Sequence, residues 1–373
     1  MRFIAALLVF LYHASYEHFF QDQQLGKSFA DAFSTTAYIG VSFFFILSGF
    51  VLTWSARSQD TPGLFLRRRL TKIFPNHIVT WAATLLLFTY VGQTIAGTPT
   101  VLNLLLVHTW VPKLAYFGSV NPVSWSLACE ILFYLSFPVL LRLIKKIRPE
   151  RLWLTAVVIV AAIFVAPLFA KLLPTNPIMP GTKTSVPQFW FVYGLPPVRG
   201  LEFLLGMVMA RLLATGRRMP LSLGPAIVLV VAGYFVAQHV TLLYSLVAAT
   251  VIPLALVIPA AASTDLRGGI SPLRVRPLVW LGEISYAFYL VHFLVIHVGH
   301  LAFGRAKLMG MAVPTHLFTT GKGIALIVVL FGVSVLLSWL LYSLVERPMM
   351  RRWSRPRSRP AVTREDPDMV PAG

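Results

Sequence analysis

Long apolar runs dominate the chain and alternate with short polar connections. Ten of these runs fit the roughly 17 to 25 residues that a helix needs to cross a bilayer. They are predicted at about 2–20, 36–56, 74–95, 123–143, 152–173, 196–213, 222–238, 241–262, 278–299 and 321–344. A shorter apolar piece, Val101 to Val107, is predicted to lie on the surface or to re-enter the membrane. No repeat or long polar stretch divides the array, so we expect one all-α, polytopic domain over residues 1–346.

Composition supports a membrane protein. The 373 residues are 57% hydrophobic and only 12% charged, with a mean hydropathy of +0.74, whereas soluble domains are about 25% charged. The single cysteine, Cys129, excludes an internal disulfide and a multi-cysteine metal site, and we expect no metal. Its thiol is interpreted as core packing.

The net charge of +19 is distributed as expected for a membrane protein rather than a nucleic-acid partner. Alternate connections of the ten-span arrangement carry 24 of the 32 basic residues. The other side carries Lys27, Lys113, Lys171, Lys183, Arg199, Arg305, Lys307 and Lys322. By the positive-inside rule the richer side is cytoplasmic, which places both termini there. The tail 347–373 is rich in Arg and Pro and then acidic, and is expected to be disordered in the cytoplasm.

The first apolar run has a second interpretation. Arg2 followed by the apolar residues Phe3 to Leu11 also fits a cleavable signal peptide in length and flanks. We favour a retained helix, because nothing after His13 resembles a small-residue cleavage site.

Glu130 lies in the middle of a predicted span. A charge near the bilayer centre costs roughly 2.5 to 10 kcal/mol unless it is paired or faces water, so its presence indicates a function. Counting the helical rise puts His13 about 16 Å and Glu130 about 20 Å above the cytoplasmic end of the core. We therefore predict that His13 and Glu130 are partners.

Other polar residues fall in the same predicted layer. Arg199, Glu202 and His292 lie at similar depth, which suggests a shared polar cavity. Ser126 and Tyr134 are each four residues from Glu130, so the three side chains should share one helix face. The alternatives are structural. Arg199 and Glu202 are three residues apart and could neutralise each other, and His292 could simply pack or bond to a neighbouring helix.

A histidine beside a carboxylate is suited to general base catalysis. Imidazole titrates near neutral pH, and a neighbouring carboxylate fixes its tautomer and stabilises the imidazolium. This chemistry suits activation of a hydroxyl for acyl transfer. It suits a proton relay in a transporter nearly as well, so these residues alone leave the reaction open.

Several stretches together resemble the integral-membrane acyltransferase 3 family, which includes O-acetyltransferases of surface polysaccharides. The stretches are Arg2 to His13, Phe43 to Leu52, Phe65 to Pro75, Trp125 to Pro138, Ile284 to His292, and Glu346-Arg347-Pro348. They span nearly the whole chain. Each motif alone is weak, but their combination is specific.

The resemblance assigns roles to individual positions. Arg2 and His13 match the family's arginine and catalytic histidine, and Glu130 matches the acidic residue of its Trp-Ser-Leu-x-x-Glu motif. Arg69 matches the first arginine of the Arg-x-x-Arg that engages the acyl donor, whereas Lys72 stands in place of the second. Lysine attracts phosphate but lacks the bidentate fork of arginine. The family usually has Asp-Gly-Leu before the first arginine, so the Met1 start suggests a truncated first helix.

The resemblance implies an enzyme of the bacterial inner membrane. It would transfer an acyl group from cytoplasmic acyl-CoA, in particular acetyl-CoA, to a hydroxyl of a surface glycan or related glycosylated acceptor. His13 would be the general base, Glu130 its orienting carboxylate or proton partner, and Arg2, Arg69 and Lys72 the donor-binding groups. The further cavity candidates are Ser126, Tyr134, Arg199, Glu202 and His292. The alternative is a transporter or flippase for lipid-linked sugars, with the polar layer as its path.

Overall fold

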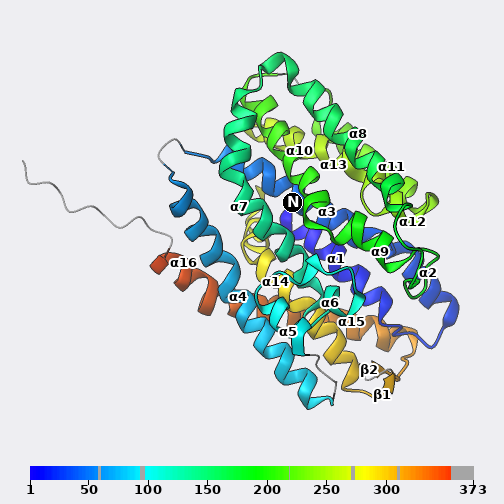
Figure 1. The fold of residues 1–373 in the computed structure, drawn as a ribbon. Helices are drawn as coiled ribbons and strands as arrows, with labels where there is room; N and C mark the ends of the chain where they lie inside the picture. The colour runs from blue at the N-terminus through cyan, green and yellow to red at the C-terminus, as the bar shows by residue number, and fades with distance from the viewer. Residues whose placement is uncertain (58–59, 93–96, 218, 270–273, 309–310, 354–373) are drawn as a thin grey trace, which may run out of the picture.

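The computed structural model describes all residues except 58–59, 93–96, 218, 270–273, 309–310 and 354–373. Helices form most of the described chain (Figure 1). They are α1 (Arg2–Tyr16), α2 (Gln23–Phe33), α3 (Thr36–Trp54), α4 (Pro62–Tyr90), α5 (Gly97–Leu104), α6 (Leu114–Phe117), α7 (Trp125–Lys146), α8 (Leu152–Ala170), α9 (Val186–Phe189), α10 (Pro196–Ala214), α11 (Leu223–His239), α12 (Leu242–Ser245), α13 (Ala248–Leu266), α14 (Arg276–Leu301), α15 (Thr320–Leu341) and α16 (Arg347–Trp353). The strands β1 (Arg305–Leu308) and β2 (Met311–Pro314) pair in antiparallel orientation.

The protein is a multi-pass membrane protein. Six helical stretches of the described chain are long and apolar enough to cross a bilayer: Gln23–Trp54, Pro122–Lys146, Pro149–Ala170, Leu242–Leu266, Arg276–Leu301 and Thr320–Trp353. Helices α1 and α11 are apolar but shorter. Helices α4 and α10 are not among the six, because polar residues interrupt their apolar surface. The all-α fold is thus confirmed, whereas the ten spans and the cytoplasmic termini stay predictions.

Helices α3 and α10 pack at the centre of the bundle at unusually close range. A Cβ atom at Gly49 of α3 would lie 1.9 Å from the carbonyl oxygen of Phe203, and one at Gly206 of α10 would lie 1.9 Å from that of Ile46. The two glycines face each other's backbone reciprocally, as small residues do in membrane helix pairs. Any side chain at these two positions would force α3 and α10 apart.

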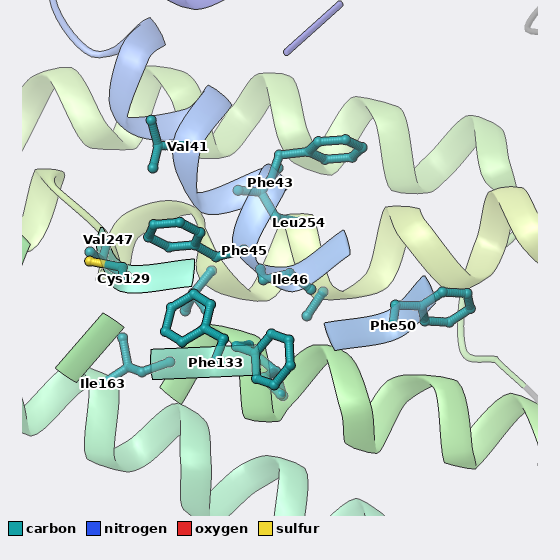
Figure 2. Close-up of a cluster of buried hydrophobic side chains, with 14 of the residues drawn as sticks. Val41, Phe43, Phe45, Ile46, Phe50, Cys129, Phe133, Ile163, Val247 and Leu254 are labelled. Atoms are coloured by element: carbon teal, nitrogen blue, oxygen red, sulfur yellow. The ribbon is translucent and has the colours of Figure 1, made fainter. Parts of the chain in front are cut away.

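Helix α1 lies between two apolar clusters. Ala5 and Val9 belong to a large cluster that includes residues of α3, α7, α8, α10 and α13. Figure 2 shows the centre of that cluster, where Cys129 is packed beside Phe45 and Val247. Phe3 and Phe10, on the other side of α1, pack with α14 and α15. The residues of α1 therefore lie at the seam between two packing units.

Several elements differ from the sequence expectation. Helix α4 begins at Pro62, twelve residues before the predicted apolar run, so the basic residues 67–72 are helical. Amphipathic α2 was expected to be a connection, and Asp22 caps it by accepting a hydrogen bond from the Leu25 amide. Residues 347–353, assigned to the disordered tail, instead form α16, which packs against α4. The rest of that tail lies outside the described residues.

Candidate active site

A cavity of about 70 Å³ lies where α1, α3, α4, α7 and α14 meet, and we call it the inner cavity. Its polar lining residues are Arg2, Ser48, Arg69, Lys72, Ser126, Glu130, Tyr134, Ser285, Tyr286 and Tyr289. Six of the ten residues selected from the sequence thus share one cavity, although they come from three helices far apart in the chain.

Helix α7 supplies the carboxylate of the inner cavity. Ser126, Glu130 and Tyr134 all line it, which confirms that their four-residue spacing places them on one face. The Tyr134 hydroxyl donates a hydrogen bond to Oε2 of Glu130 over 3.0 Å. The carboxylate therefore has a neutral partner on its own helix and faces a cavity rather than lipid.

Basic side chains from α1 and α4 face Glu130 across this cavity. Nε of Arg69 is buried without a hydrogen-bond partner among the described residues, while its guanidinium lies 5.5 Å from the centre of the Phe65 ring. Arg2 and Lys72 line both the inner cavity and a neighbouring, more open cavity that also contains Glu346. A guanidinium with an unsatisfied buried N–H, next to two further basic groups, is suited to an anionic ligand.

Glu346 is a second buried carboxylate that the sequence analysis noted only as part of a closing motif. Its Oε2 accepts a hydrogen bond of 2.7 Å from Nδ2 of Asn76. Only 2% of the residue is exposed. An acidic residue at the end of an apolar run was the available signal, because a carboxylate buried there needs a donor nearby.

His13 contacts another histidine. Its Nδ1 lies 3.1 Å from Nε2 of His292, and the two rings are 5.1 Å apart. We call these two residues the histidine pair. No hydrogen bond between His13 and Glu130 occurs among the described residues, so the expected direct partnership is not found. Depth along a helix says nothing about rotation around its axis, and α1 turns His13 toward α14.

Backbone carbonyls assign the tautomers of the histidine pair. Nδ1 of His292 lies 3.1 Å from the carbonyl oxygen of Phe288, to which only an N–H can bond. In the neutral ring Nε2 of His292 is then an acceptor, so Nδ1 of His13 carries the proton facing it. That Nδ1 also lies 2.9 Å from the carbonyl oxygen of Val9. Nε2 of His13 is left with a free lone pair and has no hydrogen-bond partner among the described residues.

The surroundings of the histidine pair are aromatic. Phe10 and Phe288 lie against His292 with ring centroids 6.4 and 5.9 Å away, and Phe293 lies 5.3 Å from His13. His292 is fully buried. Aromatic walls favour two neutral imidazoles, because desolvating a charge is far more costly than desolvating a hydrogen-bonded neutral group.

Arg199 and Glu202 form a separate, self-neutralising pair. Nη2 of Arg199 lies 3.1 Å from Oε2 of Glu202, and both side chains are buried. The guanidinium lies 5.0 Å from the rings of both Phe45 and Tyr193 and donates to Ser42 over 3.3 Å. Phe45 also lines the inner cavity, whereas Arg199 and Glu202 do not. The five ionisable groups therefore form three clusters rather than one shared cavity, and this pair fits its structural interpretation.

Tyr289 connects the inner cavity with the histidine pair. It lines the cavity, its hydroxyl lies 2.9 Å from Oγ of Ser126, and its ring centroid lies 5.8 Å from that of His292. Tyr286 and Tyr289 lie in a motif segment of the sequence but were not among the predicted site residues. Tyr286, Tyr289 and His292 follow one another at steps of three residues, and this was the signal, because residues three apart lie on adjoining parts of one helix face.

Glu17 forms a further polar group one turn beyond His13. Its Oε1 lies 2.8 Å from Nδ1 of His297, and its Oε2 lies 3.6 Å from Nδ1 of His300. These contacts fasten the end of α1 to α14. No group of His, Cys, Asp or Glu in the described part of the chain, this one included, is arranged to hold a metal ion.

Comparison with known proteins agrees with the resemblance seen in the sequence. A family model described as an acyltransferase domain matches residues 1–343. The chain belongs to the acyltransferase 3 family. This acyltransferase is 41% identical to acyltransferase MdmB of Streptomyces mycarofaciens, over 98% of the present chain and 94% of that protein.

More distant relatives have names that refer to surface glycans. The exopolysaccharide production protein ExoZ of Rhizobium meliloti is 30% identical over 84% of this acyltransferase and 89% of its own length. The peptidoglycan O-acetyltransferase OatA of Listeria monocytogenes is 24% identical over 79% of the chain, which corresponds to 48% of that protein. No solved structure matches. The protein is accordingly a membrane-embedded acyltransferase.

Proposed function

We propose that this acyltransferase moves an acyl group, usually acetyl, from acyl-CoA to a hydroxyl of a surface glycan or related glycosylated acceptor in the bacterial inner membrane. The observation that carries the proposal is the free Nε2 of His13, whose ring is fixed through Nδ1 by the Val9 carbonyl and by His292. Tyr289 connects this pair to the inner cavity with its basic residues. The names of ExoZ and OatA support a glycan as the acceptor.

His13 acts as the general base in this proposal. Its Nε2 accepts the proton of the acceptor hydroxyl while the hydroxyl oxygen attacks the thioester carbonyl carbon. A C–O bond forms, the C–S bond breaks, and the thiolate of coenzyme A leaves. His292 takes the orienting role that the sequence analysis gave to Glu130, because its Nε2 accepts from Nδ1 of His13 and stabilises the imidazolium.

In this proposal Glu130 acts in the inner cavity, where the thioester of the acyl donor binds. It lies in the inner cavity beside Arg2, Arg69 and Lys72, whose N–H groups would donate to the thioester carbonyl oxygen, on which negative charge develops during the attack. The departing thiolate requires one proton, and the acceptor hydroxyl releases one, so the reaction is balanced. In this proposal the His13 imidazolium returns that proton to the departing thiolate, while Glu130, hydrogen-bonded to Tyr134, balances the charge of the basic residues around the thioester.

A purified preparation in lipid nanodiscs tests the function. With radiolabelled acetyl-CoA and glycan or glycolipid acceptors, we expect acceptor-dependent release of the coenzyme A thiol and one acetyl mass added to the acceptor. The transporter alternative predicts an intact thioester together with movement of lipid-linked sugar. That result would contradict the proposal. Mass analysis of surface glycans and glycosylated metabolites from a deletion strain would identify the acceptor.

A further inference from the structure

A larger cavity of about 420 Å³ adjoins the inner cavity, and we call it the basic vestibule. It lies between the end of α3, the start of α4 and the end of α7. It shares Leu52 and Arg69 with the inner cavity, so the two spaces meet at these side chains. The charged residues of its lining are Arg57, Asp60, Arg68, Arg69, Arg142 and Lys145.

The charge of the basic vestibule is strongly positive. Asp60, the only acidic residue among the described residues that line it, is paired with Arg68. Arg142 and Lys145 are three residues apart on α7 and project from the same face as Pro138 and Leu141, which also line the vestibule. Arg69, at the junction with the inner cavity, has a buried Nε without a partner among the described residues. A polyanion would satisfy these groups.

Size distinguishes the two cavities. Ligand sites usually measure roughly 300 to 1,000 Å³. The basic vestibule, at about 420 Å³, falls in that range. The inner cavity, at about 70 Å³, holds only a narrow chain end. A donor with a bulky anionic head and a thin thioester arm would therefore place its head in the basic vestibule and its arm in the inner cavity.

We propose that the basic vestibule binds the adenosine 3′,5′-bisphosphate portion of coenzyme A. The pantetheine arm then passes Leu52 and Arg69 into the inner cavity. This inference rests on the proposed function for its donor, and it extends donor binding from Arg2, Arg69 and Lys72 to the vestibule pair Arg142 and Lys145. A lipid headgroup offers the same phosphate chemistry, and the experiment separates the two sources.

The test uses two donors that differ by one phosphate. In lipid nanodiscs made only of zwitterionic lipid, KM is measured for acetyl-CoA and for acetyl-dephospho-CoA, which lacks the 3′-phosphate. We expect the Arg142→Ala/Lys145→Ala double variant to raise the acetyl-CoA KM roughly 5- to 30-fold, because two partly exposed charge contacts are lost. The KM for acetyl-dephospho-CoA should change much less.

Lys146→Ala is the matched control. Lys146 is the next residue of α7 and is also exposed, but it lines a different cavity. We expect its KM values to equal those of the wild type. Equal KM increases for both donors in the double variant, or no increase for either, would overturn the inference. So would an effect that appears only when anionic lipid is added, because the site would then hold lipid headgroups.

A direct binding measurement tests the vestibule assignment independently of acyl transfer. Adenosine 3′,5′-bisphosphate should bind the wild-type protein in calorimetry, and it should bind the double variant more weakly by a similar factor. If acetyl-CoA is not consumed but this binding is observed, the proposed function fails and the vestibule assignment stands. If acetyl-CoA is consumed and the nucleotide does not bind, the vestibule assignment fails alone.

Discussion

The histidine pair and the inner cavity are neighbours through Tyr289, yet they contain opposite kinds of polar group. The pair consists of two imidazoles among phenylalanine rings, with each Nδ1 directed to a carbonyl of its own helix. The cavity contains Arg2, Arg69 and Lys72 facing Glu130. One region is suited to moving a proton and the other to holding an anion.

This difference indicates how the protein tolerates polar chemistry inside an apolar fold. Neutral hydrogen-bonded histidines can be buried at modest cost, whereas buried charges need partners or water. His292 is accordingly buried, whereas Arg69 lies where the inner cavity joins the basic vestibule. Arg2 and Lys72 also border the more open cavity that contains Glu346. If the two regions have separate tasks, substitutions in the histidine pair should lower kcat. Substitutions in the inner cavity should instead raise the KM for the acyl donor.

The largest expected effect is on His13. His13→Ala should lower kcat by about 10²- to 10⁴-fold, the usual contribution of a general base, with little change in the acyl-CoA KM. His239→Ala is the matched control, because Nδ1 of His239 makes the same bond to the carbonyl four residues earlier on exposed α11. Steady-state kinetics of correctly inserted protein measures both. A His13→Ala variant with most of the wild-type turnover would remove the base assignment.

The next effect concerns the inner cavity. Arg69→Ala should raise the acyl-CoA KM about 10- to 150-fold, because a charge-assisted hydrogen bond is worth roughly 1.5–3 kcal/mol. The acceptor KM should change little. Arg67→Ala is the control, since Arg67 lies on the same helix, bonds to the Trp353 carbonyl and lines neither cavity. An unchanged acyl-CoA KM in Arg69→Ala would place donor binding elsewhere.

The smallest effect concerns His292 as a positioning residue. His292→Phe should lower kcat roughly 2- to 12-fold, because one net hydrogen bond of about 0.5–1.5 kcal/mol to His13 is lost. His292→Gln should restore part of that loss, because the glutamine oxygen can still accept from Nδ1 of His13. Measuring both variants distinguishes a role of His292 in orienting the His13 ring from a role in packing alone. Equal losses in the two variants, or a shift in the acyl-CoA KM alone, would argue against this role.

Much of the architecture could be predicted from the chain itself. Apolar runs predicted a multi-pass helical protein, and the four-residue spacing of Ser126, Glu130 and Tyr134 predicted their common face, because both depend only on local period and solvent preference. The motifs identified the family. The basic residues of α4 were found as a motif, but their helical conformation was missed, since an apolar run does not show where a helix begins in polar sequence.

Tertiary structure decided which polar residues meet. His13 and His292 are 279 positions apart, and their contact depends on how far α1 and α14 are rotated about their axes. Neither hydropathy nor depth encodes that rotation. The close approach of α3 and α10 at Gly49 and Gly206 likewise depends on two backbones meeting. The sequence by itself therefore determined the class of protein and the candidate catalytic and binding residues. Packing alone decided that His13 faces a histidine while Glu130 faces basic side chains.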